Sequence, residues 1–357
     1  MTIADNSTES FLVLFLSPVK EFLEDESVSE ILINGPKSVY VERHGKLEKV
    51  EAAFVSEQGL KAAAMNIAKS VGRILNDEHP ILDARLPDGS RVHAVLPPLS
   101  RVGTIIAIRK FGRESLTIDK LLSFGSIDEK TERLIRALVL LSKNIIVSGA
   151  TSTGKTSILN VLSSYIPDSH RVLVIEDASE LQLQQSHVVS MEVRNADAHG
   201  KGEVTMRDLI RSALRLRPDR IVIGEIRGGE ALDLIQALNT GHAGSMSTIH
   251  ANSPTDALRR LETCALLAGI DIPLRALRDQ VVSGVEAIIH VARLPDGTRK
   301  VTEVSEVLPL ENGEYRLKPL VRWRTESIEP DGTVKGGFEK VSEPTFAELA
   351  KIYGIEL

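Results

Sequence analysis

The pattern of apolar and polar positions in the first third of the chain predicts a small domain of strands and helix. Residues 27–50 alternate apolar and polar side chains around two turn signals, which is typical of antiparallel strands. Residues 84–98 and 103–112 predict a further pair of strands. Residues 56–75 place apolar side chains at helical spacing after Ser56, a favourable N-cap. We therefore expect an α+β domain here.

The pattern changes near Asp128, where buried-strand runs begin to alternate with helical patterns. Each apolar run ends in small, polar or acidic residues. The four runs cover residues 144–149, 171–177, 220–225 and 245–250. Helical patterns at residues 205–217 and 229–241 separate several of them. Such alternation predicts an α/β domain with a mainly parallel sheet, and ligands bind at the carboxyl ends of its strands.

These patterns divide the chain into three parts. They are an N-terminal domain (1–112), a linker rich in glycine and polar residues (113–127) and an α/β domain with a C-terminal extension (128–357). The extension has strand-like pieces from about Val304 and a short helical pattern at residues 345–354. The sequence Arg-Leu-Pro-Asp-Gly occurs at residues 85–89 and 293–297, and Pro-Asp-Gly predicts a tight hairpin turn at each place.

The composition narrows the class of protein. Hydrophobic residues make up 42% of the 357 residues and charged residues 26%, as in an ordinary globular protein. The net charge of −6 gives no basic excess for nucleic acid. The single cysteine, Cys264, excludes an internal disulfide and a cysteine-rich zinc site, and we expect it to be buried and inert. The apolar run Phe11–Leu16 is too short to span a bilayer, so a cytoplasmic protein is expected.

The strongest chemical signal is a phosphate-binding loop that follows an apolar strand pattern and leads into a helical one. Gly149 to Thr156 fits the Walker A pattern, in which backbone N–H groups and a helix N-terminus surround phosphate oxygens. Lys155 is expected to bridge the β- and γ-phosphates, and the Thr156 hydroxyl to bind Mg²⁺. The absence of a guanine-reading Asn-Lys-x-Asp stretch favours ATP. The expected nucleotide-binding residues are Gly149, Ala150, Thr151, Ser152, Thr153, Gly154, Lys155, Thr156 and Ser157.

Hydrolysis also needs a group that activates water, and two of the apolar runs end in acid. One ends at Glu176 and Asp177 and the other at Glu225. Glu225 is the better candidate for activating water, and Glu176 for holding Mg²⁺-bound water. Gly224 occupies the place where a first acid is usual. The alternative is that one carboxylate only caps a neighbouring helix or pairs with an arginine.

Histidines and arginines complete the set of candidates. His250 ends a strand run, where its side chain could reach a γ-phosphate, and His242 follows a helix end. Arginines cluster in the N-terminal domain, and an arginine placed against ATP from another domain or subunit accelerates hydrolysis. These arginines are Arg85, Arg91, Arg101 and Arg109. For each of them, a solvated surface position is the alternative.

At these residues the chain resembles the secretion ATPases of type II secretion, type IV secretion and type IV pilus systems, over nearly its whole length. The motifs occur in the order that the family uses: GATSTGKT, VIEDASE, RIVIGEIRGGE within a longer match, and GSMSTIHANSP. The stretches DARLPDGSRVHAVLPPLS and GTIIAIRKFG look like the N-terminal arginine strands of one branch. That branch, the CpaF/TadA-like ATPases, drives tight-adherence (Tad, or Flp) pili.

The resemblance implies a PAS-like N-terminal domain followed by a RecA-like ATPase domain, assembled into a homo-hexameric ring. It also implies ATP and Mg²⁺ between the two domains and near subunit interfaces. By motif, Glu225 is the catalytic glutamate, which a glycine precedes in the family, and Glu176 is the second acid, a metal-site residue with Thr156. His250 and His242 are the histidine pair. Arg91 and Arg109 match arginines that reach the nucleotide, and Arg85 joins them.

The function implied is a motor at the cytoplasmic face of the inner membrane, bound to the membrane through platform proteins and driving assembly of a pilus. Two sequence features exclude other branches: the four-cysteine zinc module of type II secretion ATPases cannot form, and the Ala-Ile-Arg-Asn-Leu-Ile signature of retraction ATPases is absent. The alternative within the family is the traffic ATPase of a type IV secretion or conjugation channel. A RecA-like nucleic-acid motor is disfavoured by the net charge and by the lack of interleaved aromatic residues, and an ATP-binding switch by the full set of catalytic residues.

Overall fold

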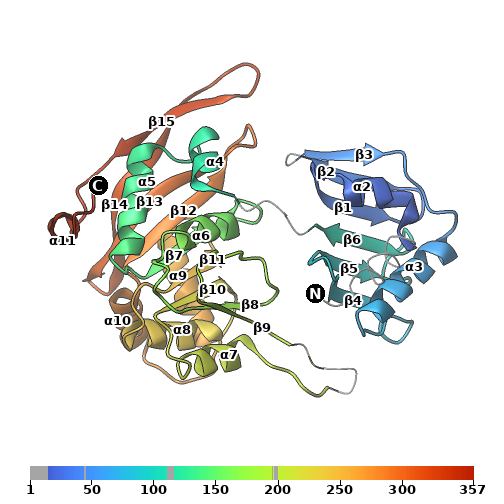
Figure 1. Ribbon diagram of the computed structural model, residues 1–357, viewed down its shortest axis with the longest axis horizontal. Coiled ribbons are helices and arrows are strands. Elements are labelled where there is room, and N and C mark those ends of the chain that lie inside the picture. The colour runs from blue at the N-terminus through green and yellow to red at the C-terminus, as the bar shows by residue number, and fades with distance from the viewer. Residues whose placement is uncertain (1–14, 44–45, 111–115, 195, 197–199) are drawn as a thin grey trace. The chain divides into compact units, whose positions relative to one another are not determined.

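The computed structural model describes residues 15–43, 46–110, 116–194, 196 and 200–357 (Figure 1). The chain divides into two compact units between Glu114 and Ser115, each with a sheet of its own. This division lies inside the expected linker. The linker's second half differs from the expectation: α4 (Ile118–Ser123) buries Leu121 in the core of the second unit.

The first unit is built on a six-stranded antiparallel sheet in the order β3-β2-β1-β6-β5-β4. Its elements are η1 (Ser17–Val19), α2 (Lys20–Glu24), β1 (Val28–Asn34), β2 (Val39–Arg43), β3 (Lys46–Val50), α3 (Glu57–Ser70), β4 (Ile81–Arg85), β5 (Arg91–Val95) and β6 (Ile105–Arg109). The side chain of Ser56 accepts the Gly59 N–H and so caps α3, as predicted. The α+β prediction for this region is confirmed.

The second unit contains a nine-stranded sheet in the order β15-β14-β13-β12-β7-β11-β10-β8-β9. From β12 to β9 neighbouring strands are parallel, and from β12 to β15 they are antiparallel. The strands are β7 (Ile145–Gly149), β8 (Val172–Glu176), β9 (Val188–Glu192), β10 (Arg220–Ile226), β11 (Met246–His250), β12 (Ala287–Arg293), β13 (Arg299–Glu311), β14 (Glu314–Ile328) and β15 (Val334–Lys340).

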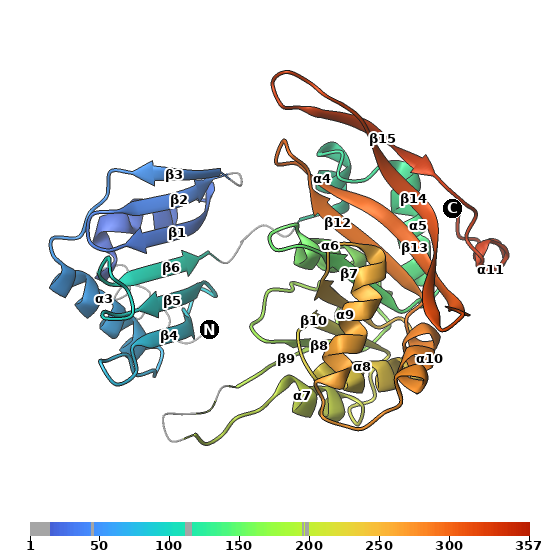
Figure 2. The same cartoon turned by 180° about the vertical axis from the view of Figure 1, so that it is seen from behind.

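Helices cover both faces of the parallel part of this sheet (Figures 1 and 2). They are α5 (Glu129–Leu140), α6 (Lys155–Ser163), α7 (Met206–Ala213), α8 (Glu230–Asn239), α9 (Pro254–Leu266) and α10 (Leu274–Gly284). Ile145 and Val147 pack in the core that α5 and α6 cover, whereas Ile146 packs in the core that α7 to α10 cover. Successive strand residues point to opposite faces, so a strand buried on both sides is a continuous apolar run. This burial explains the four runs in the sequence.

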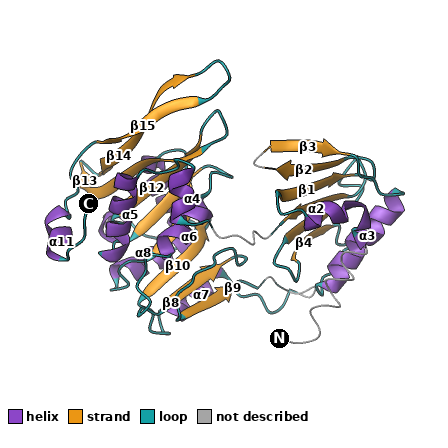
Figure 3. Cartoon of the chain, turned by 45° about the horizontal axis from the view of Figure 1, so that its top comes forward, coloured by secondary structure: helices purple, strands orange, loops and turns teal. Residues whose placement is uncertain are grey.

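The antiparallel extension accounts for the strand-like C-terminal pieces, and α11 (Ala347–Ile352) for the last helical pattern (Figure 3). The two Pro-Asp-Gly turns join β4 to β5 and β12 to β13. They have the same hydrogen bonds: Leu86 N–H donates to the Ser90 carbonyl at 2.8 Å, and Leu294 N–H to the Thr298 carbonyl at 2.8 Å. Both hairpin predictions are confirmed.

Two smaller expectations also have an outcome. Cys264 is buried in α9, and burial raises the pKa of its thiol, which agrees with an inert side chain. Of the apolar run at residues 11–16, the first four residues lie outside the described part of the chain, and Leu16 packs in the core of the first unit. None of the helices in the described ranges combines the length and apolar character needed to cross a bilayer.

Gly244 lies just before β11 and tests the packing against Arg220 at the start of β10. Its φ is +76°, and a Cβ there would lie 1.2 Å from Nη1 of the fully buried Arg220. We expect Gly244→Ala to lower the free energy of unfolding by about 2–4 kcal/mol through strain and overpacking. Urea titration followed by the fluorescence of Trp323, the one tryptophan and a member of the second unit, measures this.

Gly241→Ala is the matched control, because Gly241 also has a positive φ of +100° but has nothing within 4 Å of the added Cβ. Gly241→Ala should lower the free energy of unfolding by only about 1 kcal/mol, from the strain of an alanine at positive φ. Equal losses in the two variants would contradict the packing explanation.

Candidate nucleotide site at the carboxyl edge of the parallel sheet

The loop between β7 and α6 has the curled form that a phosphate needs. A Cβ on Gly149 would lie 2.3 Å from the Val291 carbonyl oxygen and 2.6 Å from Thr153 Oγ1, so only glycine fits beside β12. Ser152 has a φ of 59° and Gly154 of 93°, both left-handed. These two positions reverse the chain within a few residues and direct successive backbone N–H groups to one side. The expected residues 149–157 are therefore one continuous strand–loop–helix unit.

Lys155 begins α6 and is buried, with 7% of its surface exposed. Its Nζ donates to the Ala150 carbonyl at 3.0 Å, and Thr153 Oγ1 donates to the same oxygen at 2.9 Å. The helix N-cap is Gly154, which has no side chain to accept the N–H groups of the first turn. A helix N-terminus of this kind attracts an anion.

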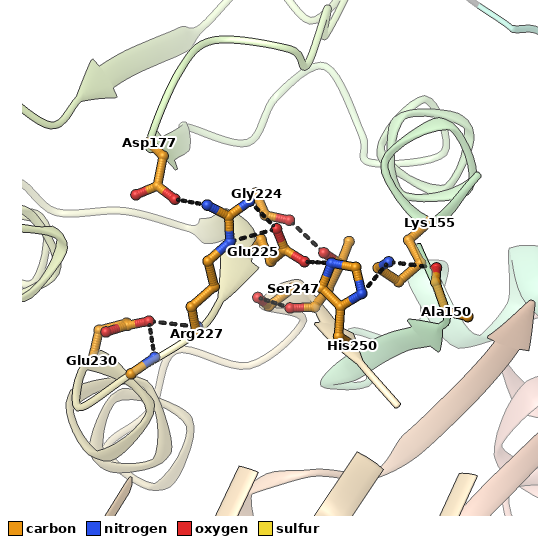
Figure 4. Close-up of polar contacts among 11 residues, drawn as sticks. Ala150, Lys155, Asp177, Gly224, Glu225, Arg227, Glu230, Ser247 and His250 are labelled. Atoms are coloured by element: carbon orange, nitrogen blue, oxygen red, sulfur yellow. Dashed lines mark hydrogen bonds and ion pairs between the residues drawn. The ribbon is translucent and has the colours of Figure 1, made fainter. Parts of the chain in front are cut away.

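A carboxylate on β10, an imidazole at the end of β11 and a lysine at the start of α6 lie in a row (Figure 4). Oε1 of Glu225 lies 2.5 Å from Nε2 of His250, and Nδ1 of His250 lies 3.3 Å from Nζ of Lys155. Glu225 is on β10, and His250 ends β11, which pairs on its other side with β7 at Gly149. The strand-end argument correctly predicted that Glu225 and His250 emerge beside the phosphate loop.

The protonation of His250 follows from its neighbours. Burial lowers its pKa, the positive charges of Lys155 and Arg227 lower it further, and Glu225 opposes them. The imidazole is therefore neutral near pH 7. Because Lys155 can only donate, Nδ1 is the acceptor and Nε2 carries the proton that faces Glu225.

Arg227 holds the other oxygen of Glu225 and was missed by the sequence reasoning. Its Nε donates to Glu225 Oε2 at 2.8 Å, and its Nη1 donates to Asp177 Oδ2 at 3.0 Å. The Glu230 carboxylate accepts the backbone N–H groups of Arg227 and Gly228 at 2.6 and 2.7 Å. Residues two apart in an extended segment lie on the same side of it. The spacing of Glu225 and Arg227 was therefore the sequence signal that could have predicted their contact.

Glu176 lies beside Gly224, the glycine that precedes Glu225. β8 and β10 pair in register up to Ile175 and Ile223, so Glu176 and Gly224 lie side by side. A Cβ at position 224 would lie 3.0 Å from Glu176 Cγ. The glutamate side chain thus occupies the space that a side chain on Gly224 would need.

The Glu176 carboxylate also has a structural task. It is buried, and its Oε1 accepts the N–H groups of Glu180 at 2.9 Å and Leu181 at 3.0 Å. The next N–H, of Gln182, donates to Asn160 Oδ1 on α6 at 2.9 Å. Residues 179–185 form a loop, so these bonds are not a helix cap; through Gln182 and Asn160 the loop links this carboxylate to the helix that carries Thr156.

His242 is not part of this group of residues. Its Nδ1 lies 3.3 Å from the Ala237 carbonyl at the end of α8, before β11 begins. β11 runs from there to His250, so the two histidines lie at opposite ends of one strand. The family resemblance paired His242 with His250, and within this unit the structure does not bring their side chains together.

Three of the four arginines form a row in the first unit. In register, Arg85 on β4 pairs with Arg91 on β5, and Arg91 pairs with Arg109 on β6. Directly paired residues in an antiparallel sheet point to the same face. Glu30 on β1 continues the row beside Arg109: burial raises its pKa, and Arg109 opposes that shift. Arg101 lies in the loop before β6 and outside the row.

A buried polar pair lies at the base of the phosphate loop and was also missed. Ser148, the residue before Gly149, lies with its Oγ 2.8 Å from Nδ1 of His290 on β12. Burial lowers the pKa of His290, and the carboxylates of Glu303 and Asp256 oppose this. The pair links β7, the strand before the loop, to its parallel neighbour β12.

An apolar strand, a Walker A loop, a helix N-terminus and a strand-end carboxylate define the class: this is a P-loop ATPase. A family model for Type II/IV secretion system proteins matches residues 15–318. The chain belongs to this family and is a secretion-system ATPase, an ATP hydrolase.

Two relatives agree with this assignment, and a solved structure shares the fold. A Mycobacterium tuberculosis protein, provisionally named as a conjugal transfer protein, is 34% identical over 314 residues, which are 86% of this chain and 88% of the relative. The type IV secretion system protein VirB11 of Bartonella quintana is 31% identical over 338 residues, 84% and 94% of the two chains. The crystal structure of the pilus retraction motor PilT with bound ADP has the same fold, with a TM-score of 0.58, 20% identity and coverage of 84% and 83%.

These two relatives are named for conjugation and type IV secretion, and neither name refers to a tight-adherence pilus. They support the superfamily that the motifs indicated. They favour the traffic ATPase, the alternative within the family, over the pilus branch that the sequence suggested first.

His290 should make stability depend on pH. Its folded-state pKa lies below the ordinary value of about 6.5, so the unfolded chain binds the extra proton first. The stabilising effect is fully present above pH ~6.5 and is lost as the pH falls toward the folded-state pKa, by at most about 1.4 kcal/mol per pH unit.

We expect wild type to lose more of its free energy of unfolding between pH 8 and pH 5.5 than His290→Gln, which does not titrate. Urea titrations at both values measure this. An identical pH dependence in the two proteins would contradict the role of His290.

Proposed function

We propose that this chain is the ATP-hydrolysing motor subunit of a type IV secretion or conjugation machine. The observation that carries the proposal is the Glu225–His250–Lys155 chain beside the phosphate loop, and the names of the relatives support the choice of machine. The tight-adherence pilus motor is the second candidate, and the N-terminal arginine stretches that resemble that branch favour it.

Deletion of the gene, with plasmid-borne complementation, distinguishes the two machines. The primary proposal expects loss of conjugal or protein transfer with surface pili intact. Loss of pili with transfer intact would favour the second candidate.

In the proposed mechanism, Glu225 orients and activates the attacking water. Neutral His250 lies with its Nε2 2.5 Å from Glu225 Oε1 and limits the directions that this carboxylate can take. Lys155 leaves the Ala150 carbonyl to contact the β- and γ-phosphates of ATP. Arg227 donates to the second oxygen of Glu225, which restricts rotation of the carboxylate before reaction.

Mg²⁺ fits the oxygen donors at this edge, since the Thr156 hydroxyl and a carboxylate are the hard ligands it prefers. We propose Thr156 as its direct ligand and Glu176 as the acceptor for its bound water. The Glu176–loop–Asn160 bonds support this, because Asn160 lies one turn after Thr156 on α6. The ion would neutralise charge on the transferring phosphate.

The arginine row is proposed to complete the site from the N-terminal unit. Arg91 and Arg109, with Arg85 beside them, would offset the charge of the phosphates. We further propose a homo-hexameric ring that docks on inner-membrane platform proteins at the cytoplasmic face, as the family resemblance implies. This role needs no stable contact with nucleic acid.

Glu225→Gln should keep ATP binding and lower turnover roughly 100-fold or more, because a positioned general base contributes that much. A phosphate-release assay and an ATP titration measure the two quantities. Glu192→Gln is the matched control: Glu192 ends β9 at the same edge of the sheet, in register with Glu176. Turnover near that of wild type in Glu225→Gln would contradict the proposal that Glu225 activates the attacking water.

Arg91→Ala and Arg109→Ala should each lower turnover by at least ~10-fold, in the direction seen when an arginine that offsets transition-state charge is removed. Arg101→Ala, which removes one charge from the same unit outside the row, should leave turnover within about twofold. Equal effects in all three variants would mean that the row has no special role.

Specific activity should rise with protein concentration if the ring completes the sites, since assembly then follows mass action. Light scattering recorded alongside the phosphate assay tests this. A fully active monomer would refute the ring.

A further inference from the structure

Arg299, the first residue of β13, reaches the phosphate loop from the C-terminal extension. Its Nε donates to the Ser152 carbonyl at 3.0 Å, a contact between residues 147 apart in the sequence. Its Cδ would lie 3.5 Å from a Cβ placed on Gly154. One exposed arginine therefore contacts Ser152 and lies against Gly154, the two left-handed positions of the loop.

The contact bears on the direction of the loop's N–H groups. In a trans peptide the carbonyl and the following N–H point in opposite directions, so fixing the Ser152 carbonyl also fixes the N–H of Thr153. The Ala150 carbonyl is held in turn by Thr153 Oγ1 and Lys155 Nζ. Ser152 is not glycine, so its left-handed backbone is strained, and a charge-assisted hydrogen bond to its carbonyl offsets that strain.

Arg299 is itself held firmly. The Asp296 carboxylate accepts the Thr298 N–H at 2.9 Å in the Pro-Asp-Gly turn that precedes it. The next residue, Lys300, is buried and donates to the Gly125 carbonyl at 2.6 Å, with its Nζ 5.0 Å from the centre of the Trp323 ring. A turn on one side and a buried lysine on the other fix the start of β13.

We propose that Arg299 is a nucleotide-positioning residue. It holds the phosphate loop in its anion-binding form through the hydrogen bond to the Ser152 carbonyl. The C-terminal extension thereby contributes to nucleotide affinity, a role that lies outside the Walker A, acidic and histidine motifs. The proposal rests on ATP binding at this loop, and it assigns Arg299 an effect on binding and none on the chemical step.

The test is a calorimetric titration of ATP in the presence of EDTA, together with steady-state hydrolysis in Mg²⁺. Arg299→Ala should raise Kd roughly tenfold, about the value of one charge-assisted hydrogen bond, with kcat at saturating ATP within about twofold of wild type. Arg299→Lys, which keeps the charge and a donor, should recover most of the affinity. Arg324→Ala is the matched control, since Arg324 is an exposed arginine of the same extension that pairs with Glu339.

Lys155→Ala separates this proposal from the proposed function. Unchanged Kd in Arg299→Ala, with binding lost in Lys155→Ala, would overturn the role of Arg299 and leave the ATPase assignment standing. Unchanged Kd in both variants would overturn the nucleotide site itself. A lower kcat with unchanged Kd, or an equal loss of affinity in Arg324→Ala, would also overturn the proposal, and Trp323 emission confirms that each variant is folded.

Discussion

The parallel pairing of β7, β11 and β10 is the constraint on which the site depends. β11 lies between the other two strands, and its hydrogen bonds to both set the heights at which Gly149, His250 and Glu225 leave the sheet. Apolar side chains fill the cores on both faces and hold this register, because a slip by one residue would exchange the faces. The relative positions of the phosphate loop, His250 and Glu225 therefore depend on the packing of the whole parallel sheet.

Much of the fold could be predicted because burial on both faces leaves a plain trace in the sequence. The runs at β7, β8, β10 and β11 are continuous and apolar, and each matched a strand. β9 (Val188–Glu192) escaped notice because its residues are only partly buried or exposed, which gives no apolar run. The length of β13 and β14 also escaped, because it depends on their pairing with each other and no spacing records that.

The residues of the candidate site also fall into those that a strand pattern could place and those that depend on contacts between distant segments. Glu225 and His250 could be placed because each ends a recognisable strand, whereas His242 precedes its strand and lies at the other edge. Contacts between neighbouring strands could not be predicted from the sequence. Ser148 contacts His290, and Arg299 contacts Ser152, although the residues of each pair are far apart in the chain. The arginine row depends on the register of β4, β5 and β6. The turn at residues 85–89 sets Arg85 opposite Arg91, and composition alone does not show that pairing.

Glu176 and Gly224 share one volume between two strands, and this has a consequence for how such sequences vary. A larger residue at position 224 requires a shorter side chain at position 176, so the two positions should covary across relatives in opposite directions of size. In this chain the Glu176 side chain fills the space that a side chain at position 224 would take, so the two positions act as one unit of packing.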